Sequence, residues 1–138
     1  MLCWMTAFAG CGGPPDPADE FEQKAARASQ AFPATIITQV ELRRNPTAYL
    51  LVDTRTEEEF ATSHLPGAIN WPDYKSGELP IAARQHVGAD KPVVFYCSIG
   101  YRSGEATVRA AKLLGSDPMV FNLYGGIFQW ANEGGRLE

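Results

Sequence analysis

The sequence has few cysteines and histidines, and they are widely separated. Its three cysteines, Cys3, Cys11 and Cys97, form no C-x-x-C pair, and it has only two histidines. A structural zinc site needs about four clustered ligands, so these residues supply a zinc site poorly. An odd number of scattered cysteines also fits no complete disulfide framework. We therefore expect no metal and no other cofactor, and each cysteine needs its own explanation.

A surplus of positive charge and long apolar runs are also missing. The formal net charge is -4 at pH 7 and no basic run occurs, so nucleic acid is not an expected partner. No stretch approaches the ~20 apolar residues of a membrane-spanning helix. What is present is a chain of 138 residues, 45% hydrophobic and 20% charged, which suits one globular domain.

The N-terminal residues resemble a bacterial lipoprotein signal. Residues 1–10 carry no charged side chain, and residues 8–11 (FAGC) place two small residues before a cysteine, as a lipobox does. In this interpretation Cys11 is the lipid-attachment residue and Cys3 is removed with the leader. The chain is then held at a membrane of the cell envelope, facing the periplasm. The alternative is a plain apolar N-terminus on a cytoplasmic protein.

Two further segments separate this leader from the main domain. Residues 12–17 (GGPPDP) cannot continue a helix or a sheet, so residues 1–17 read as a leader and a flexible tether. Helix-forming residues dominate 18–31 and end before Pro33, which predicts an N-terminal helical segment over 18–33. The remaining residues, 34–138, form the predicted domain.

Strand-like and helix-like segments alternate through this domain. Short β-prone runs occur at residues 34–37, 49–52, 68–70, 92–96 and 119–123. Helical patterns occur at residues 39–44, where Thr38 is the expected N-cap, 56–60, 78–87 and 104–114, and after Gly126. This alternation predicts an α/β fold of three layers, in which a parallel sheet of about five short strands has helices on both faces.

Polar residues follow two of the predicted strands. Asp53 comes directly after residues 49–52, and Cys97 comes directly after residues 92–96. Ligands of parallel α/β sheets bind beyond the carboxyl ends of the strands. We therefore expect Asp53 and Cys97 to lie near one another at a functional edge of the sheet.

The segment after residue 96 has the features of a reactive cysteine loop. Cys97 is followed by Gly100, which allows a tight curl, then by Arg102 and the start of a helix. In such a loop the amides of residues 98–102 can form an anion-binding nest, and a sulfur at its rim is stabilised as the nucleophilic thiolate. The alternative is that Cys97 is a small buried hydrophobic residue, which requires neither the glycine nor the arginine.

Four motifs in this order resemble the rhodanese-like family of single-domain sulfurtransferases. They cover residues 35–134 and comprise D-x-R-x-x-x-E-F from Asp53, H-x-P-G-A-x-N from His64, C-x-x-G-x-R-S from Cys97, and G-G-x-x-x-W from Gly125. The resemblance implies that Cys97 takes a sulfane sulfur from a small donor as a persulfide. A thiol or cyanide then accepts that sulfur. The rhodanese fold is the one predicted above.

The resemblance also implies roles for the residues around Cys97. Ser98, Ile99 and Tyr101 would shape the mouth of the pocket, and Gly100 and Ser103 would support the loop. Arg102 would either assist an anionic donor or brace the loop by pairing with Asp53, and we favour bracing. Asp53 and Arg55 would fix the turn after their strand, and His64 would bond to backbone. The acidic run 57–59 would not attract a dianion, which argues against thiosulfate as the natural donor.

Two other functions occur among proteins with a similar cysteine loop or fold. Phosphatases and arsenate reductases with related folds have five residues between cysteine and arginine, whereas four separate Cys97 from Arg102 here. The shorter loop suits one sulfur atom better than a tetrahedral oxyanion. A non-catalytic rhodanese-like binding module is the second alternative, although such modules commonly lack the cysteine.

Overall fold

The computed structural model describes residues 12–115 and 119–138. The predicted lipobox, with Cys3 and the lipid-attachment residue Cys11, lies outside the described residues. Within them, no helix is long and apolar enough to cross a membrane.

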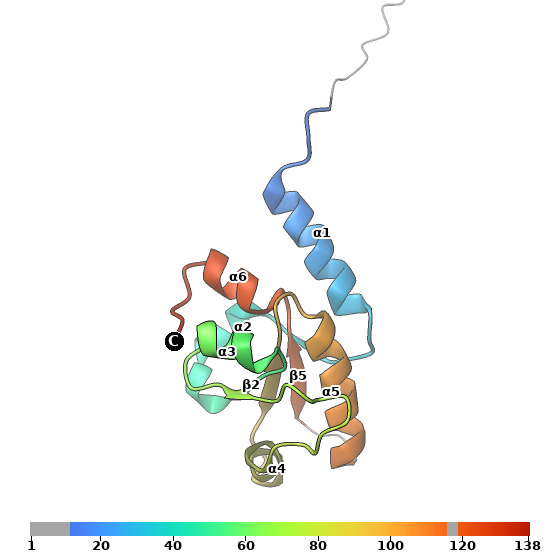
Figure 1. Ribbon diagram of the computed structural model, residues 1–138, viewed down its shortest axis with the longest axis vertical. Helices are drawn as coiled ribbons and strands as arrows, with labels where there is room; N and C mark the ends of the chain where they lie inside the picture. The colour runs from blue at the N-terminus through green and yellow to red at the C-terminus, as the bar shows by residue number, and fades with distance from the viewer. Residues whose placement is uncertain (1–11, 116–118) are drawn as a thin grey trace, which may run out of the picture.

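A five-stranded parallel sheet forms the centre of the domain (Figure 1). Its strands are β1 (Ile36–Ile37), β2 (Leu50–Asp53), β3 (Ile69–Asn70), β4 (Val93–Tyr96) and β5 (Val120–Leu123). They lie in the order β1-β5-β4-β2-β3, and every neighbouring pair is parallel. The predicted α/β class and the predicted number of strands are confirmed.

In the part of the chain that the structure describes, six α-helices and one short 3-10 turn, Pro46–Ala48, connect and precede the strands. The helices are α1 (Pro17–Gln30), α2 (Gln39–Arg44), α3 (Glu57–Thr62), α4 (Ile81–Gly88), α5 (Tyr101–Leu114) and α6 (Gly126–Asn132). Thr38 caps α2 as predicted, and both α2 and α3 begin with a full capping box, in which a glutamate at the third position bonds back to the cap.

Two helix starts differ from prediction by three residues. Helix α5 begins at Tyr101 and not at Gly104, because Gly100, with φ of +111°, ends the loop and Gly104 lies inside the helix. A Cβ on Gly104 would lie 3.2 Å from Asn122 and 3.3 Å from Phe32, so this glycine allows close packing. Helix α4 begins at Ile81, since Pro80 occupies the cap position.

Each face of the sheet carries its own apolar core. Val93 and Phe95 point to a core shared with Ala83 of α4 and with Ala106 and Ala110 of α5. The alternate residues of the same strand, Val94 and Tyr96, point to a second core; its helical members are Leu42 of α2 and Ile127 and Trp130 of α6. Successive side chains of a strand point to opposite faces, so a strand buried on both sides is apolar throughout. The three-layer arrangement is confirmed, and Trp130 is a core aromatic as expected.

The functional edge is formed where β2 and β4 end. Asp53 is the last residue of β2 and is paired in register with Tyr96, the last residue of β4. Cys97 follows Tyr96 immediately, so the two predicted polar residues lie at the carboxyl ends of neighbouring strands.

Candidate active site

Cys97 lies at the base of a short loop between β4 and α5. Its sulfur accepts a hydrogen bond from the Gly100 amide at 3.2 Å and lies 3.4 Å from the Ser103 hydroxyl oxygen. The left-handed conformation of Gly100 turns its N–H back toward the sulfur, and glycine adopts that conformation without strain. Of the amides predicted to surround the sulfur, that of Gly100 is the one that bonds it.

The sulfur lies deeper than the loop sequence suggests. Cys97 is 1% exposed, so the expectation of a sulfur at an open rim is wrong. The loop folds back so that the Gly100 amide contacts the sulfur. Ser103, in the first turn of α5, also contacts the sulfur. Any group that reacts at Cys97 would have to reach the sulfur between the loop residues, and this arrangement favours a small group.

The first residues of α6 form backbone hydrogen bonds with the cysteine loop. The amides of Ile127 and Phe128 donate to the carbonyls of Cys97 and Ser98, at 2.9 and 3.1 Å. A Cβ on Gly126 would lie 2.4 Å from the Cys97 carbonyl oxygen, so only glycine fits there. The expectation that the Gly125-Gly126 pair brings the last turn close to the cysteine loop is confirmed.

Arg102 braces the loop, but through a different carboxylate from the one expected. Its guanidinium binds both oxygens of Glu59, at 2.9 and 3.0 Å, and donates to the Ser98 hydroxyl at 3.0 Å. The predicted partner was Asp53, which is fully occupied by Arg55. Bidentate pairing with Arg102, reinforced by the Thr56 amide, lowers the pKa of Glu59 to about 2 despite partial burial. The same pairing raises the pKa of Arg102.

This ion pair predicts a specific acid sensitivity. Because the pKa of Glu59 is about 2 in the folded chain and 4.5 ordinarily, its contribution to stability is present above about pH 4.5 and is lost toward pH 2. We expect wild type to lose more thermal stability than Glu59→Gln between about pH 6 and about pH 3. Glu58→Gln, which removes an exposed charge from the same helix, is the control and should follow wild type. Parallel Tm curves for wild type and Glu59→Gln would contradict the prediction.

Asp53 and Arg55 fix the turn after β2, as predicted. The Asp53 carboxylate accepts from the Arg55 amide at 2.9 Å and pairs with the guanidinium at 2.6 Å, and the Arg55 guanidinium also donates to the Ser63 carbonyl at 2.7 Å. The two side chains are 0% and 6% exposed. Burial opposes the charge on Arg55, but its bonds to Asp53 outweigh this and raise its pKa.

The other predicted residues are half-buried or exposed, unlike Cys97. Ser98 and Ile99 are half-buried, and Tyr101 is exposed and meets the ring of Phe32 edge-on. His64 bonds the Phe60 carbonyl through Nδ1 at 2.9 Å, as expected for a structural histidine. Phe32 was not predicted as a neighbour, because it precedes the predicted domain and reaches the loop only through the fold.

A buried amide beside Cys97 was missed altogether. Asn122 in β5 is 0% exposed, accepts from the Ser103 hydroxyl at 2.6 Å and donates to the Gly100 carbonyl at 2.9 Å. The available signal was an isolated polar residue in the apolar run 119–123, which needs a buried hydrogen-bonding partner.

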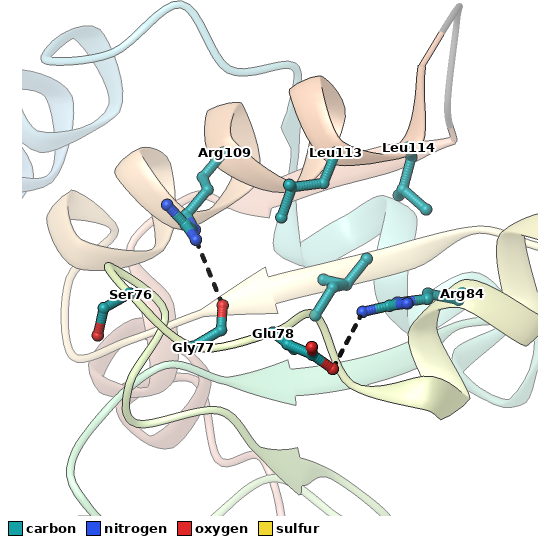
Figure 2. A pocket seen from close by; sticks show the side chains of 8 residues that line it. Ser76, Gly77, Glu78, Arg84, Arg109, Leu113 and Leu114 are labelled. Carbon is teal, nitrogen blue, oxygen red and sulfur yellow. Dashed lines mark hydrogen bonds and ion pairs between the residues drawn. The ribbon is translucent and has the colours of Figure 1, made fainter.

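A separate cavity of about 360 Å³ lies near the far end of α5, between that helix and the segment before α4 (Figure 2). Its lining includes Arg84, Arg109 and Leu113 and contains none of the predicted site residues. The chemistry predicted from the sequence is therefore associated with the cysteine loop and not with this cavity.

A parallel α/β sheet with a cysteine loop at the end of its central strand defines the class of protein. The chain belongs to the rhodanese-like family: the family model described as a rhodanese-like domain matches residues 37–133. The match includes the cysteine loop, the Asp53–Arg55 turn and the Gly125-Gly126 turn.

Several individual proteins are similar to this chain in sequence or structure. The uncharacterized protein YqhL of Bacillus subtilis is 32% identical over 104 residues, which cover 74% of each chain. The thiosulfate:glutathione sulfurtransferase of Saccharomyces cerevisiae is 30% identical over 95 residues, 62% of this chain and 67% of the yeast protein. The solved structure of a human single-domain sulfurtransferase is 29% identical, with a TM-score of 0.55 over 72% of this chain and 97% of that one.

Proposed function

We propose that this protein is a sulfurtransferase that carries sulfur on Cys97 as a persulfide. The observation that carries the proposal is the Gly100 amide, which donates to the sulfur of Cys97 at 3.2 Å at the start of the 14-residue helix α5. A backbone amide and the positive end of a helix dipole both favour an anionic sulfur. The resemblance to named sulfurtransferases supports the same chemistry.

The proposed reaction has two transfers. The Cys97 thiolate attacks the terminal sulfur of a donor R–S–SH, and the donor's S–S bond breaks with its electron pair leaving on R–S⁻. Cys97 then carries the added sulfur as Cys–S–SH, which ionises. In the second transfer an acceptor thiolate or cyanide attacks that outer sulfur, and the Cys97 thiolate leaves. Each step exchanges one S–S or S–C bond for another, so no external oxidant or reductant is required.

Mass spectrometry of the intact protein tests the proposal. After incubation with cysteine hydropersulfide, thiosulfate or polysulfide, wild type should gain the mass of one sulfur atom, and cyanide should remove it with release of thiocyanate. Both proteins carry Cys3→Ser and Cys11→Ser, so that Cys97 is the remaining thiol, and Cys97→Ala in this background should gain none. Equal gain on both proteins would place the sulfur elsewhere. No gain on either, with all three donors, would favour a non-catalytic binding module.

The ion pair between Arg102 and Glu59, beside the cysteine loop, predicts which sulfur donors the protein prefers. Glu59 neutralises Arg102, so this arginine does not offer a free positive charge to a dianion such as thiosulfate. Glu59→Gln keeps the cap of α3 but releases the charge of Arg102. We expect kcat/KM for thiosulfate to rise roughly twofold to fivefold, the size of one partly exposed charge interaction.

Two comparisons make this donor test specific. The kcat/KM for cysteine hydropersulfide should stay within about twofold in Glu59→Gln, because that donor carries less negative charge. Glu58→Gln removes the same charge without touching Arg102 and should leave both donors unchanged. An equal rise in Glu58→Gln would mean that net charge alone controls thiosulfate use.

A further inference from the structure

The side chain of Asn122 bonds both groups that touch the Cys97 sulfur. Its Nδ2 donates to the carbonyl of Gly100, whose amide bonds the sulfur, and its Oδ1 accepts from Ser103, whose hydroxyl oxygen lies 3.4 Å from the sulfur. Asn122 itself is 0% exposed and lies within β5. Asn122 therefore connects β5 to both Gly100 and Ser103, the two residues that contact the sulfur.

We propose that Asn122 is a positioning residue for sulfur transfer, acting through Gly100 and Ser103. The proposal rests on the sulfurtransferase function above and adds a residue from a strand outside the cysteine loop. One arm of the amide holds the Gly100 carbonyl, and this contact fixes the backbone on the other side of the Cα whose N–H faces the sulfur. The other arm determines where the single proton of the Ser103 hydroxyl points.

The geometry at Ser103 shows why its hydrogen bond to Asn122 Oδ1 matters for the sulfur. A serine hydroxyl has one proton and two acceptor lone pairs. The hydroxyl oxygen lies 2.6 Å from Asn122 Oδ1 and 3.4 Å from the Cys97 sulfur, so its single proton can be donated to either acceptor but to only one at a time. The shorter contact favours donation to Asn122, and the hydroxyl can turn toward Cys97 when negative charge develops on the sulfur during transfer. Without Asn122 the hydroxyl is free to rotate, and the arrangement around the sulfur is no longer unique.

The close approach of Asn122 to the loop depends on Gly104. A Cβ at Gly104 would lie 3.2 Å from Asn122 Nδ2, closer than most side-chain contacts. The first turn of α5 therefore provides the space that the amide needs. Together these contacts connect β5, the loop and α5 at the sulfur.

The experiment compares the full-length wild type with Asn122→Leu, Ser103→Ala and the double variant. We expect Asn122→Leu to lower kcat for sulfur transfer from cysteine hydropersulfide to cyanide by about tenfold, with KM within about twofold, because substrate contacts are unchanged. Since Asn122 acts partly through Ser103, the double variant should be less impaired than the product of the two single effects.

Thr107→Val is the matched control. Thr107 is also buried on α5 and its hydroxyl bonds the Ser103 carbonyl at 2.7 Å, but it does not bond the sulfur. It should lose stability and keep kcat. Unchanged kcat in Asn122→Leu, or multiplicative effects in the double variant, would overturn the inference.

Two further outcomes separate this inference from the proposed function. If Asn122→Leu does not fold, Asn122→Ala decides, because it removes both hydrogen bonds with a smaller side chain that carries no charge. A fall in its kcat supports the inference and an unchanged kcat refutes it. Failure of wild type to take up sulfur from any donor would instead refute the sulfurtransferase proposal.

Discussion

Replacing Asp53 by asparagine is expected to lower the free energy of unfolding by about 3–5 kcal/mol. The substitution keeps the shape of the side chain but removes the counter-ion of Arg55, which is 6% exposed. An uncompensated buried guanidinium is costly, because little water is available to solvate it. Denaturant unfolding followed by circular dichroism measures the loss.

The control for this prediction is an exposed pair. Glu20→Gln removes the same charge from the surface pair between Glu20 and Lys24 and should leave stability unchanged within error. Combining Asp53→Asn with Arg55→Met should recover about half of the loss or more, since it also removes the buried charge. A loss in Asp53→Asn no larger than in Glu20→Gln would show that Arg55 is adequately solvated without its partner.

The sequence was sufficient to predict the sheet and to predict that Cys97 follows its central strand. Residues 92–96 form an uninterrupted apolar run, because β4 is covered on both faces, and such a run is visible without any tertiary information. The spacing of Cys97, Gly100 and Arg102 is equally local. The left-handed turn at Gly100 and the bond from its amide to the sulfur follow from that local pattern.

The contacts that complete the site are long-range, and local patterns do not determine them. Glu59 and Asp53 are both acidic residues near the end of β2, and the sequence did not distinguish which of them meets Arg102. The choice depends on Arg55, which folds back onto Asp53 and leaves Glu59, on α3, facing the loop. Asn122 was missed for the same reason, because its partners come from a loop about 20 residues earlier that only strand pairing brings near.

The burial of Cys97 also comes from tertiary structure. The sequence placed the sulfur at the rim of a loop, whereas in the fold the start of α6 packs against this loop and donates two backbone hydrogen bonds to the carbonyls of Cys97 and Ser98. The backbone that carries the buried sulfur is therefore bonded to a helix that begins about 30 residues later. This dependence makes the contact between α6 and the loop a strong target for mutation.

Gly126→Ala is expected to have the second large effect, on both stability and sulfur transfer. The new Cβ would lie 2.4 Å from the Cys97 carbonyl oxygen and 2.6 Å from the Ser98 carbonyl oxygen, and backbone atoms cannot move aside cheaply. The substitution also places alanine at φ of +56°, which costs about 1 kcal/mol. Overpacking adds about 1–3 kcal/mol.

The effect on transfer follows from where the clash occurs. The carbonyls that must move belong to Cys97 and its neighbour, so relieving the clash displaces the sulfur from the Gly100 amide. We expect uptake of sulfur from cysteine hydropersulfide, followed by intact mass, to slow by tenfold or more. Gly134→Ala is the matched control, because Gly134 has φ of +79° and no atom lies within 4 Å of the place that its new Cβ would take. It carries the same backbone strain without the clash and should transfer sulfur like wild type. Equal stability loss and equal transfer in the two variants would show that the loop tolerates the added methyl group, and that α6 does not control the position of the sulfur.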